Sequence, residues 1–162
     1  MDCEIKHLEC EKHSLKAKII VGIEVKTSNA PGESEKDIPA LWDRFMTDNI
    51  QDQIPNKADS TVYGIYTHYE GDHTAPYTVI IGCEVTELPD ELPEGLMTHT
   101  TPACTYAHIP MTGSFPEGVM KAWQSVWCSD LERSFTSDFE AYDETFNPAN
   151  GCQGSNLYIA IK

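Results

Sequence analysis

The feature that most constrains this chain is a pair of amphipathic helical patterns. In each pattern, apolar residues recur at the spacing of one helical face. The first comprises Ile38, Leu41, Trp42, Phe45 and Met46, and the second comprises Val119, Met120, Trp123, Val126, Trp127 and Leu131. Asp37, followed by Pro39, predicts the start of the first helix. The capping box Ser114-x-x-Glu117 predicts the start of the second.

The two helical patterns stand half a chain apart, which indicates a duplicated unit. Trp42 and Trp123 hold equivalent positions 81 residues apart in a chain of 162 residues. Short runs of β-branched and aromatic residues flank each helix and predict strands at residues 18–26, 61–69, 77–85, 103–111, 138–143 and 156–161, with residues 3–11 as a further candidate. A turn at Gly71, Asp72 and His73 predicts a hairpin between two of these strands. The resulting order is β-α-β-β, twice.

The repeat predicts an α+β fold. Each β-α-β-β unit is too small to bury its apolar faces alone, so we expect the two to share one antiparallel sheet with both helices on one face and a ligand groove between them. The acidic, turn-rich residues 88–95 mark the boundary. The chain is therefore predicted to be a single domain made of two pseudo-repeats, at about residues 1–88 and 96–162.

One pair of residues breaks the match between the two repeats. When residues 63–66 are aligned with residues 139–142, Gly64 falls opposite Glu140. Alternate residues of a strand share a face, so Tyr66 accompanies Gly64 and Tyr142 accompanies Glu140. If this face looks toward the helices, a carboxylate stands at the floor of the groove beside a glycine that leaves room for a ligand.

Aromatic residues are predicted to line this groove. The candidates are Trp42 and Trp123 from the helices, and Tyr66, Tyr142 and Tyr158 from the strands. Rings around one carboxylate suit a flat organic cation. Two alternatives stay open. The tryptophans of an amphipathic stripe are commonly plain core residues, and Glu140 can instead face solvent or pair with a Lys or Arg.

Charge and residue spacing exclude several function classes. The formal net charge of −15 disfavours binding to nucleic acids and to anionic membranes. No apolar stretch approaches the roughly 20 residues of a membrane span, and residues 1–14 show no signal-peptide core, so we expect a cytoplasmic protein. None of the six cysteines forms C-x-x-C, and Cys83, Cys104 and Cys128 are interpreted as small core residues. The six histidines are scattered, so neither a metal nor a cofactor is predicted.

Several short motifs, taken in order, resemble the GyrI-like effector-binding superfamily. They are IPALWDRF at residues 38–45, VYGIY at residues 62–66 with Glu70 and Asp72, the helix residue Trp123, DFEAY at residues 138–142 and LYI at residues 157–159. Within the superfamily the chain looks most like the stand-alone effector-binding proteins carried on integron gene cassettes. The resemblance runs from about residue 15 to the C-terminus.

The resemblance implies a central groove that takes cationic, lipophilic compounds, as in the ligand domains of MerR- and AraC-type multidrug regulators. The superfamily's buried glutamate would fall on Glu140 and its terminal-strand tyrosine on Tyr158. Those regulators also carry a helix-turn-helix domain, for which this sequence has no basic recognition helix, so no direct DNA binding is expected. A separate regulator or a homodimer remains a possible partner.

Three function classes follow. The leading hypothesis is a binding module for cationic amphiphilic small molecules, with Glu140 as counter-ion. The second is a small-molecule hydrolase, since some members of the superfamily are hydrolases; the same glutamate would then act as general base, because no defensible nucleophile arrangement is present. The third is a protein-interaction modulator of the gyrase-binding type, in which the acidic surface docks on a basic partner.

Overall fold

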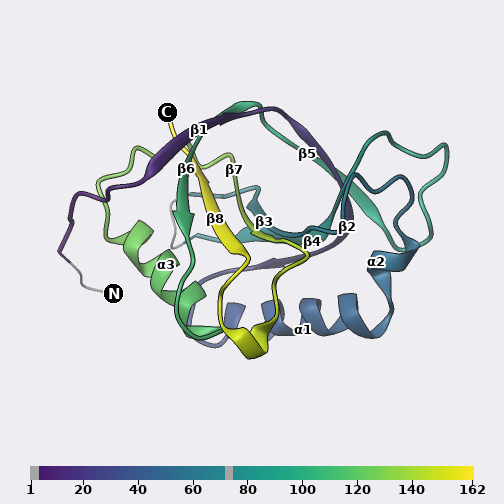
Figure 1. Cartoon of the computed structure of the whole chain (residues 1–162), viewed down its shortest axis with the longest axis horizontal. Coiled ribbons are helices and arrows are strands. Elements are labelled where there is room, and N and C mark those ends of the chain that lie inside the picture. Colours follow the sequence, from purple (N-terminus) through teal and green to yellow (C-terminus); the bar gives the residue numbers. More distant parts are fainter. Residues whose placement is uncertain (1–3, 72–74) are drawn as a thin grey trace.

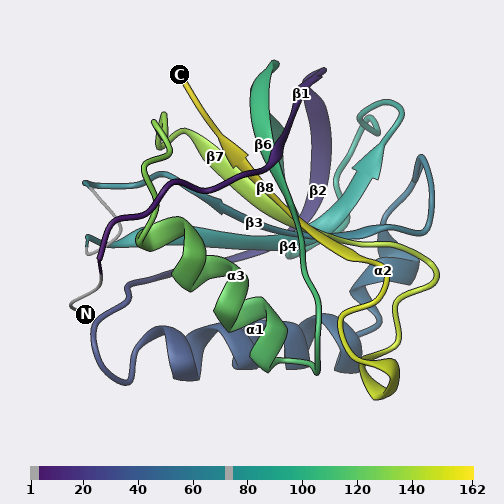
Figure 2. The ribbon, with the colours of Figure 1, turned by 60° about the vertical axis from the view of Figure 1, so that its left-hand side comes forward.

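A single eight-stranded antiparallel sheet forms the centre of the molecule, and the helices lie beneath it (Figures 1 and 2). The computed structural model describes residues 4–71 and 75–162. The strands are β1 (Glu11–Leu15), β2 (Lys18–Thr27), β3 (Val62–Thr67), β4 (Tyr77–Val85), β5 (Met97–Thr101), β6 (Cys104–Pro110), β7 (Ser137–Tyr142) and β8 (Ser155–Ala160). The helices are α1 (Ser34–Thr47), α2 (Ile50–Gln53) and α3 (Glu117–Trp127), with a 3-10 turn at Pro148–Asn150. The predicted α+β class and shared antiparallel sheet are confirmed.

The strand order has an internal symmetry. It runs β1-β6-β8-β7-β3-β4-β2-β5, and it maps onto itself when β1 to β4 are exchanged with β5 to β8. The first strand of each half is swapped: β1 pairs with β6, and β5 pairs with β2. This is the arrangement that a duplicated unit would give, although the duplication itself stays a prediction.

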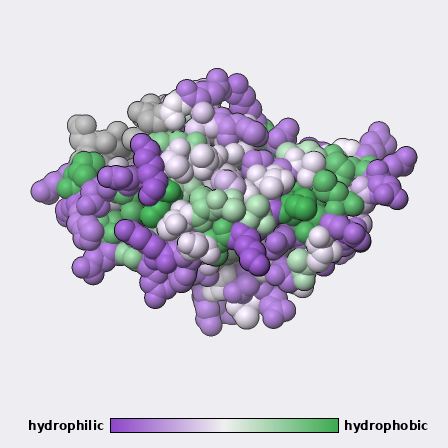
Figure 3. Space-filling model, turned by 90° about the horizontal axis from the view of Figure 1, so that it is seen from above, coloured by the Kyte–Doolittle hydropathy of each residue, from purple (hydrophilic) through white to green (hydrophobic). Residues whose placement is uncertain are grey.

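The two faces of the sheet bury separate apolar clusters. On the helix face, Leu41 and Phe45 of α1 pack over one cluster, and Ala122 and Val126 of α3 pack over another. A third cluster, around Tyr106, Phe139, Ile20, Ile65 and Ile80, lies on the opposite face. Figure 1 shows β1 and β5 arching over that opposite face. Seen from above in Figure 3, hydrophilic residues surround separate hydrophobic patches.

Two glycines allow neighbouring strands to approach closely. Gly22 of β2 and Gly82 of β4 are paired in register. A Cβ atom added to Gly22 would lie 2.0 Å from the carbonyl oxygen of Ile81, far inside a van der Waals contact. Only glycine fits at this pair of positions.

The helix boundaries differ from the predicted ones. Helix α1 begins at Ser34 rather than at Asp37, so Pro39 lies inside it. Pro39 has no N–H, so the carbonyl of Glu35 receives no helical hydrogen bond from it. Both residues are exposed, so water can donate to that carbonyl instead. Met46 belongs to the predicted apolar stripe, yet it is exposed.

The structure corrects further predictions outside α1. Helix α3 ends at Trp127, short of Leu131. The side-chain hydroxyl of Ser114 donates to the Glu117 carboxylate and does not cap the helix. The first strand is β1 at residues 11–15 rather than residues 3–11, and β5 was not predicted.

The predicted turn and the predicted core cysteines have different outcomes. Asp72 and His73 of the predicted turn lie outside the described residues. Cys83 is buried in the core as expected, whereas Cys128 is disulfide-bonded. Among the described residues, no helix is long and apolar enough to cross a membrane.

Candidate functional site

The site forms where the two halves of the sheet meet. Strands β3 and β7 are neighbours, and Gly64 pairs with Glu140 in register. The sequence alignment of the repeats predicted this pair. The Glu140 side chain points toward the helices, and the residue is only 2% exposed. A carboxylate is therefore buried at the seam, as the sequence predicted.

Three neutral side chains donate hydrogen bonds to the Glu140 carboxylate. The indole Nε1 of Trp123 donates to Oε2 at 2.7 Å, and the hydroxyl of Tyr66 donates to the same oxygen at 2.8 Å. The hydroxyl of Tyr142 donates to Oε1 at 2.5 Å. The donors come from α3, β3 and β7, so the carboxylate joins elements of both halves.

Trp42 supplies the wall on the α1 side. Its ring meets the ring of Tyr142 edge to face, with centroids 5.4 Å apart. Trp42 and Tyr66 each pack against both helix-face clusters, which places them at the seam. A Cβ atom added to Gly64 would lie 3.4 Å from the Trp42 ring and 3.5 Å from Oε1 of Glu140. The absent side chain of Gly64 thus leaves a small space between the ring and the acid.

Burial dominates the electrostatics of this cluster. It raises the pKa of Glu140 above the usual range, and the hydrogen bonds from Tyr142, Trp123 and Tyr66 oppose that rise only in part. Burial also raises the pKa of Tyr66 and of Tyr142, and the neighbouring Glu140 charge adds to the rise. Both tyrosines therefore stay neutral donors at physiological pH.

A second buried carboxylate stands two residues away on the same strand and face. Asp138 is 0% exposed and forms an ion pair with Arg133, Nη2 to Oδ2, at 2.7 Å. The hydroxyl of Tyr69 donates to the same oxygen at 2.5 Å, and the backbone N–H of Ala160 donates to Oδ1 at 2.8 Å. Sequence reasoning missed this network, although the alternation that places Glu140 also places Asp138.

The two carboxylates differ in one decisive respect. Asp138 has a cation, Arg133, within its hydrogen-bonding shell. Glu140 receives only neutral donors, and no Lys, Arg or His among the described residues forms an ion pair with it. The alternative in which a basic side chain holds Glu140 is therefore contradicted within residues 4–71 and 75–162.

The groove expected between the helices is filled by the protein's own rings at this point. Trp123 and Tyr142 are each 7% exposed and close over the carboxylate, with Trp42 and Tyr66 half-buried beside them. Two surface hollows lie elsewhere. One is beside α1 and is lined by Glu24, Val25, Asp37, Ala40, Leu41 and Arg44, and the other follows residues 7–12.

Tyr158 does not join the cluster. It pairs in register with Phe139, while its neighbour Leu157 pairs with Glu140. Because side chains alternate along β8, Tyr158 points to the opposite face of the sheet and stacks on Phe139 and His108 with centroids 4.9 Å from each. Five of the six predicted site residues are therefore brought together, and Tyr158 is not.

Comparison with known proteins identifies the family. The family model described as "Integron-associated effector binding protein" matches residues 13–161. The chain belongs to this family. The YobU protein of Bacillus subtilis (strain 168), whose name describes a role in transcriptional regulation, is 32% identical over 153 residues, which cover 91% of this chain and 94% of YobU. The resemblance found in the motifs is confirmed, and the family description is one of effector binding rather than catalysis.

Solved structures agree with this assignment. The integron cassette protein VCH_CASS2 from the mobile metagenome of Vibrio cholerae is 28% identical, with a TM-score of 0.69 over 94% of this chain and 95% of that chain. SAV2435, solved bound to tetraphenylphosphonium, has a TM-score of 0.76 over 96% of this chain and 94% of that chain at 15% identity, so it shows the same fold. The chain is thus an effector-binding module of the GyrI-like type.

Proposed function

We propose that this chain binds cationic, lipophilic small molecules, with Glu140 as the counter-ion and Trp42, Tyr66, Trp123 and Tyr142 as aromatic walls. The observation that carries the proposal is the contrast between the two buried acids of β7. Asp138 is neutralised by Arg133 at 2.7 Å, whereas the donors to Glu140 within the described part of the chain are all neutral. A buried carboxylate without a cation is costly, and a positively charged ligand would remove that cost.

The residues around Glu140 suit a cation with aromatic or other apolar groups. Tyrosine and tryptophan faces attract positive charge, and their large apolar area stabilises a lipophilic ligand. Gly64 adds a small space directly beside the acid. Its chain neighbours apart, the described residues place only the Trp42 ring and Oε1 of Glu140 within 4 Å of the position that a Cβ atom would take.

Ligand entry requires ring movement, and the energetics allow it. Displacing one hydrogen bond to a charged group costs about 1.5–3 kcal/mol. An ion pair at about 4 Å contributes roughly 4 kcal/mol at an effective dielectric constant near 20. Tyr66 and Trp42 are the half-buried members of the cluster, so they are the rings that we expect to swing outward.

Tetraphenylphosphonium is the natural first probe. It is a permanent, lipophilic cation, and SAV2435, a protein with the same fold, was solved bound to it. Triphenylphosphine oxide provides a neutral aryl compound of related shape. Isothermal titration calorimetry with both compounds separates the contribution of charge from that of apolar contact.

Two variants test the counter-ion. In Glu140→Gln we expect tetraphenylphosphonium binding to weaken at least tenfold while binding of the neutral compound is retained. Glu132→Gln removes the same charge from an exposed residue and serves as the control for long-range attraction, so we expect its affinity to match wild type. Equal affinity of wild type and Glu140→Gln for the cation, or no saturable binding of lipophilic cations to wild type, would overturn the proposal.

A further inference from the structure

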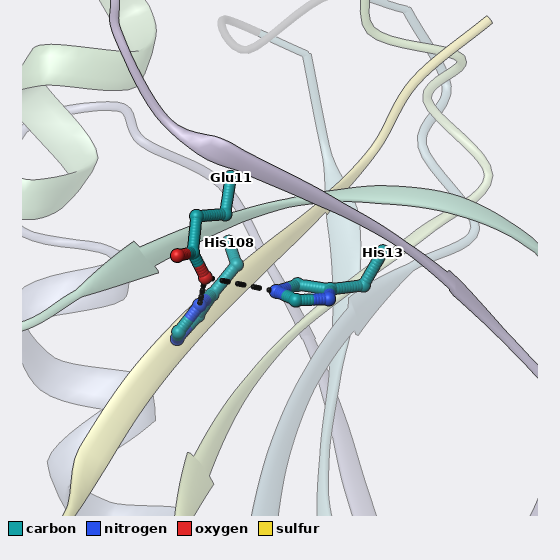
Figure 4. Close-up of side chains that lie close together, drawn as sticks. All are labelled: Glu11, His13 and His108. Atoms are coloured by element: carbon teal, nitrogen blue, oxygen red, sulfur yellow. Dashed lines mark hydrogen bonds and ion pairs between the residues drawn. The ribbon is translucent and has the colours of Figure 1, made fainter.

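A second cluster of functional side chains lies on the opposite face of the sheet, where β1 crosses β6. Glu11 and His13 are alternate residues of β1, and Glu11 pairs in register with His108 of β6. The three side chains therefore project from one face of the two-stranded ribbon and converge, as Figure 4 shows. Their carboxylate and imidazole atoms all lie within 4.8 Å of one another.

The distances match those between ligands of one metal ion. Oε2 of Glu11 lies 3.2 Å from Nε2 of His13 and 3.6 Å from Nδ1 of His108. Ligands that bind Zn²⁺ tetrahedrally at 2.0–2.2 Å stand about 3.4 Å apart. One ligand atom from each residue lies within 4.8 Å of the other two, and the His13 side chain is 44% exposed, so it has room to adjust around an ion.

A hydrogen bond to Asn156 determines which nitrogen of His108 is available to a metal. Its Nε2 lies 2.8 Å from Oδ1 of Asn156, an amide oxygen that only accepts, so Nε2 carries the proton. In the neutral imidazole the lone pair is then on Nδ1, the nitrogen nearer to Glu11. A hydrogen bond from the distal nitrogen to an oxygen is the usual outer partner of a metal-bound histidine, because it fixes the tautomer and the ring orientation. Tyr158 stacks on the ring at an interplanar angle of 13° and holds it from the side.

The Nδ1 atom of His108 faces the Glu11 carboxylate, with 3.6 Å between Nδ1 and Oε2. It is buried and has no hydrogen-bond partner among the described residues, and the nearby Glu11 carboxylate is also an acceptor. In the neutral imidazole the two atoms are both acceptors, and they repel unless a positive charge, either a proton on Nδ1 or a metal ion, lies between them. Asn156 and Tyr158 fix the ring, so His108 does not turn away from Glu11.

We propose that Glu11, His13 and His108 bind one divalent zinc-type metal ion. Imidazole and carboxylate ligands suit Zn²⁺, and three protein ligands leave a fourth position for water. The ion would tie β1 to β6. Four of the five residues of β1 are exposed, so the strand has few apolar contacts of its own. Metal binding would therefore pin this edge strand, which comes from the first half of the chain, onto the second half.

Calorimetric titration of the chelator-treated full chain with ZnCl₂ tests the site. Wild type is expected to bind one equivalent and to unfold at a higher temperature with zinc than without. Glu11→Gln and His13→Ala change exposed side chains, so they are expected to fold normally while zinc affinity falls at least tenfold. Co²⁺ offers a spectroscopic readout, since its visible absorption reports ligation.

Two control variants exclude other ligands of the same region. His7 is an exposed histidine that lies 3.0 Å from Asp130, and Cys10 is a free, half-buried cysteine next to Glu11. His7→Ala and Cys10→Ser are expected to bind zinc as wild type does. The proposal is overturned if wild type binds no zinc, if Glu11→Gln and His13→Ala bind it as tightly as wild type, or if only the Cys10 variant loses binding.

Discussion

The two buried acids of β7 should respond oppositely to loss of charge. Asp138→Asn leaves the Arg133 guanidinium buried, at 8% exposure, with no carboxylate to pair with. Breaking a buried ion pair from one side costs about 3–5 kcal/mol. For a chain of this length each kcal/mol corresponds to about 2–4 °C, so the melting temperature should fall by roughly 6–20 °C.

Glu140→Gln should instead preserve or raise stability at neutral pH. The amide oxygen can accept from Trp123 and Tyr66, and the amide N–H can donate to the hydroxyl of Tyr142, so each group keeps a partner. The folded-state pKa of Glu140 is raised, so the folded protein holds this proton more tightly than the unfolded chain. The ordinary pKa of a glutamate is about 4.5. Raising the pH above this value therefore lowers the free energy of unfolding of wild type, until the carboxyl is ionised in the folded state as well. Glu140→Gln has no carboxyl at this position, so its stability does not fall for this reason as the pH rises.

Urea denaturation followed by far-ultraviolet circular dichroism checks both variants. At each pH between 4.5 and 8 the free energy of unfolding of Asp138→Asn should lie below that of wild type. The difference between Glu140→Gln and wild type should grow in favour of the variant as the pH rises. If Glu140→Gln loses as much stability as Asp138→Asn, the neutral donors satisfy Glu140 as fully as Arg133 satisfies Asp138, and the physical case for a cationic ligand fails.

Three further outcomes follow from the structure. Gly22→Ala should lower the free energy of unfolding in a urea titration by about 2–3 kcal/mol or more, because its Cβ atom would lie 2.0 Å from the Ile81 oxygen. Gly64→Ala is the control: its Cβ atom would make ordinary contacts, so the free energy of unfolding should change by less than about 1 kcal/mol. Gly64→Val should fill the space beside Glu140 and abolish tetraphenylphosphonium binding in calorimetry; unchanged affinity would place the ligand elsewhere. Cation affinity should decline on acidification, starting at a higher pH than an ordinary glutamate would give, because the pKa of Glu140 is raised; a pH-independent affinity would contradict its role as counter-ion.

Much of the candidate site follows from local sequence patterns. Period-two alternation places Glu140 and Tyr142 on one face of β7, and the repeat places Gly64 opposite Glu140. The helical stripes place Trp42 and Trp123 on the buried faces of α1 and α3. These relations depend only on residue spacing and on backbone geometry, which a sequence specifies directly.

Other features depend on contacts between distant segments. The stripe pattern alone does not show that Met46 is exposed, because exposure depends on which parts of the sheet cover the helix. The face to which Tyr158 points depends on the register of β8 against β7, and a shift of one residue would reverse it. Likewise, the sequence shows acids at 138 and 140 but not that Arg133 pairs with the first of them.

The sequence by itself determined the α+β class, the two helices and the buried acid opposite a glycine, because periodicity and repetition are local properties of the chain. Only the tertiary structure decided that aromatic rings, and no basic side chain of the described residues, surround the Glu140 carboxylate. It also decided that β1 pairs with β6, which brings Glu11 and His13 to His108. The sequence spacing of those three residues gives no metal motif, since strand pairing joins positions almost a hundred residues apart. The physical reason is that the pairing of strands distant in sequence depends on the packing of the whole sheet. Strand alternation and helical spacing depend only on the local backbone.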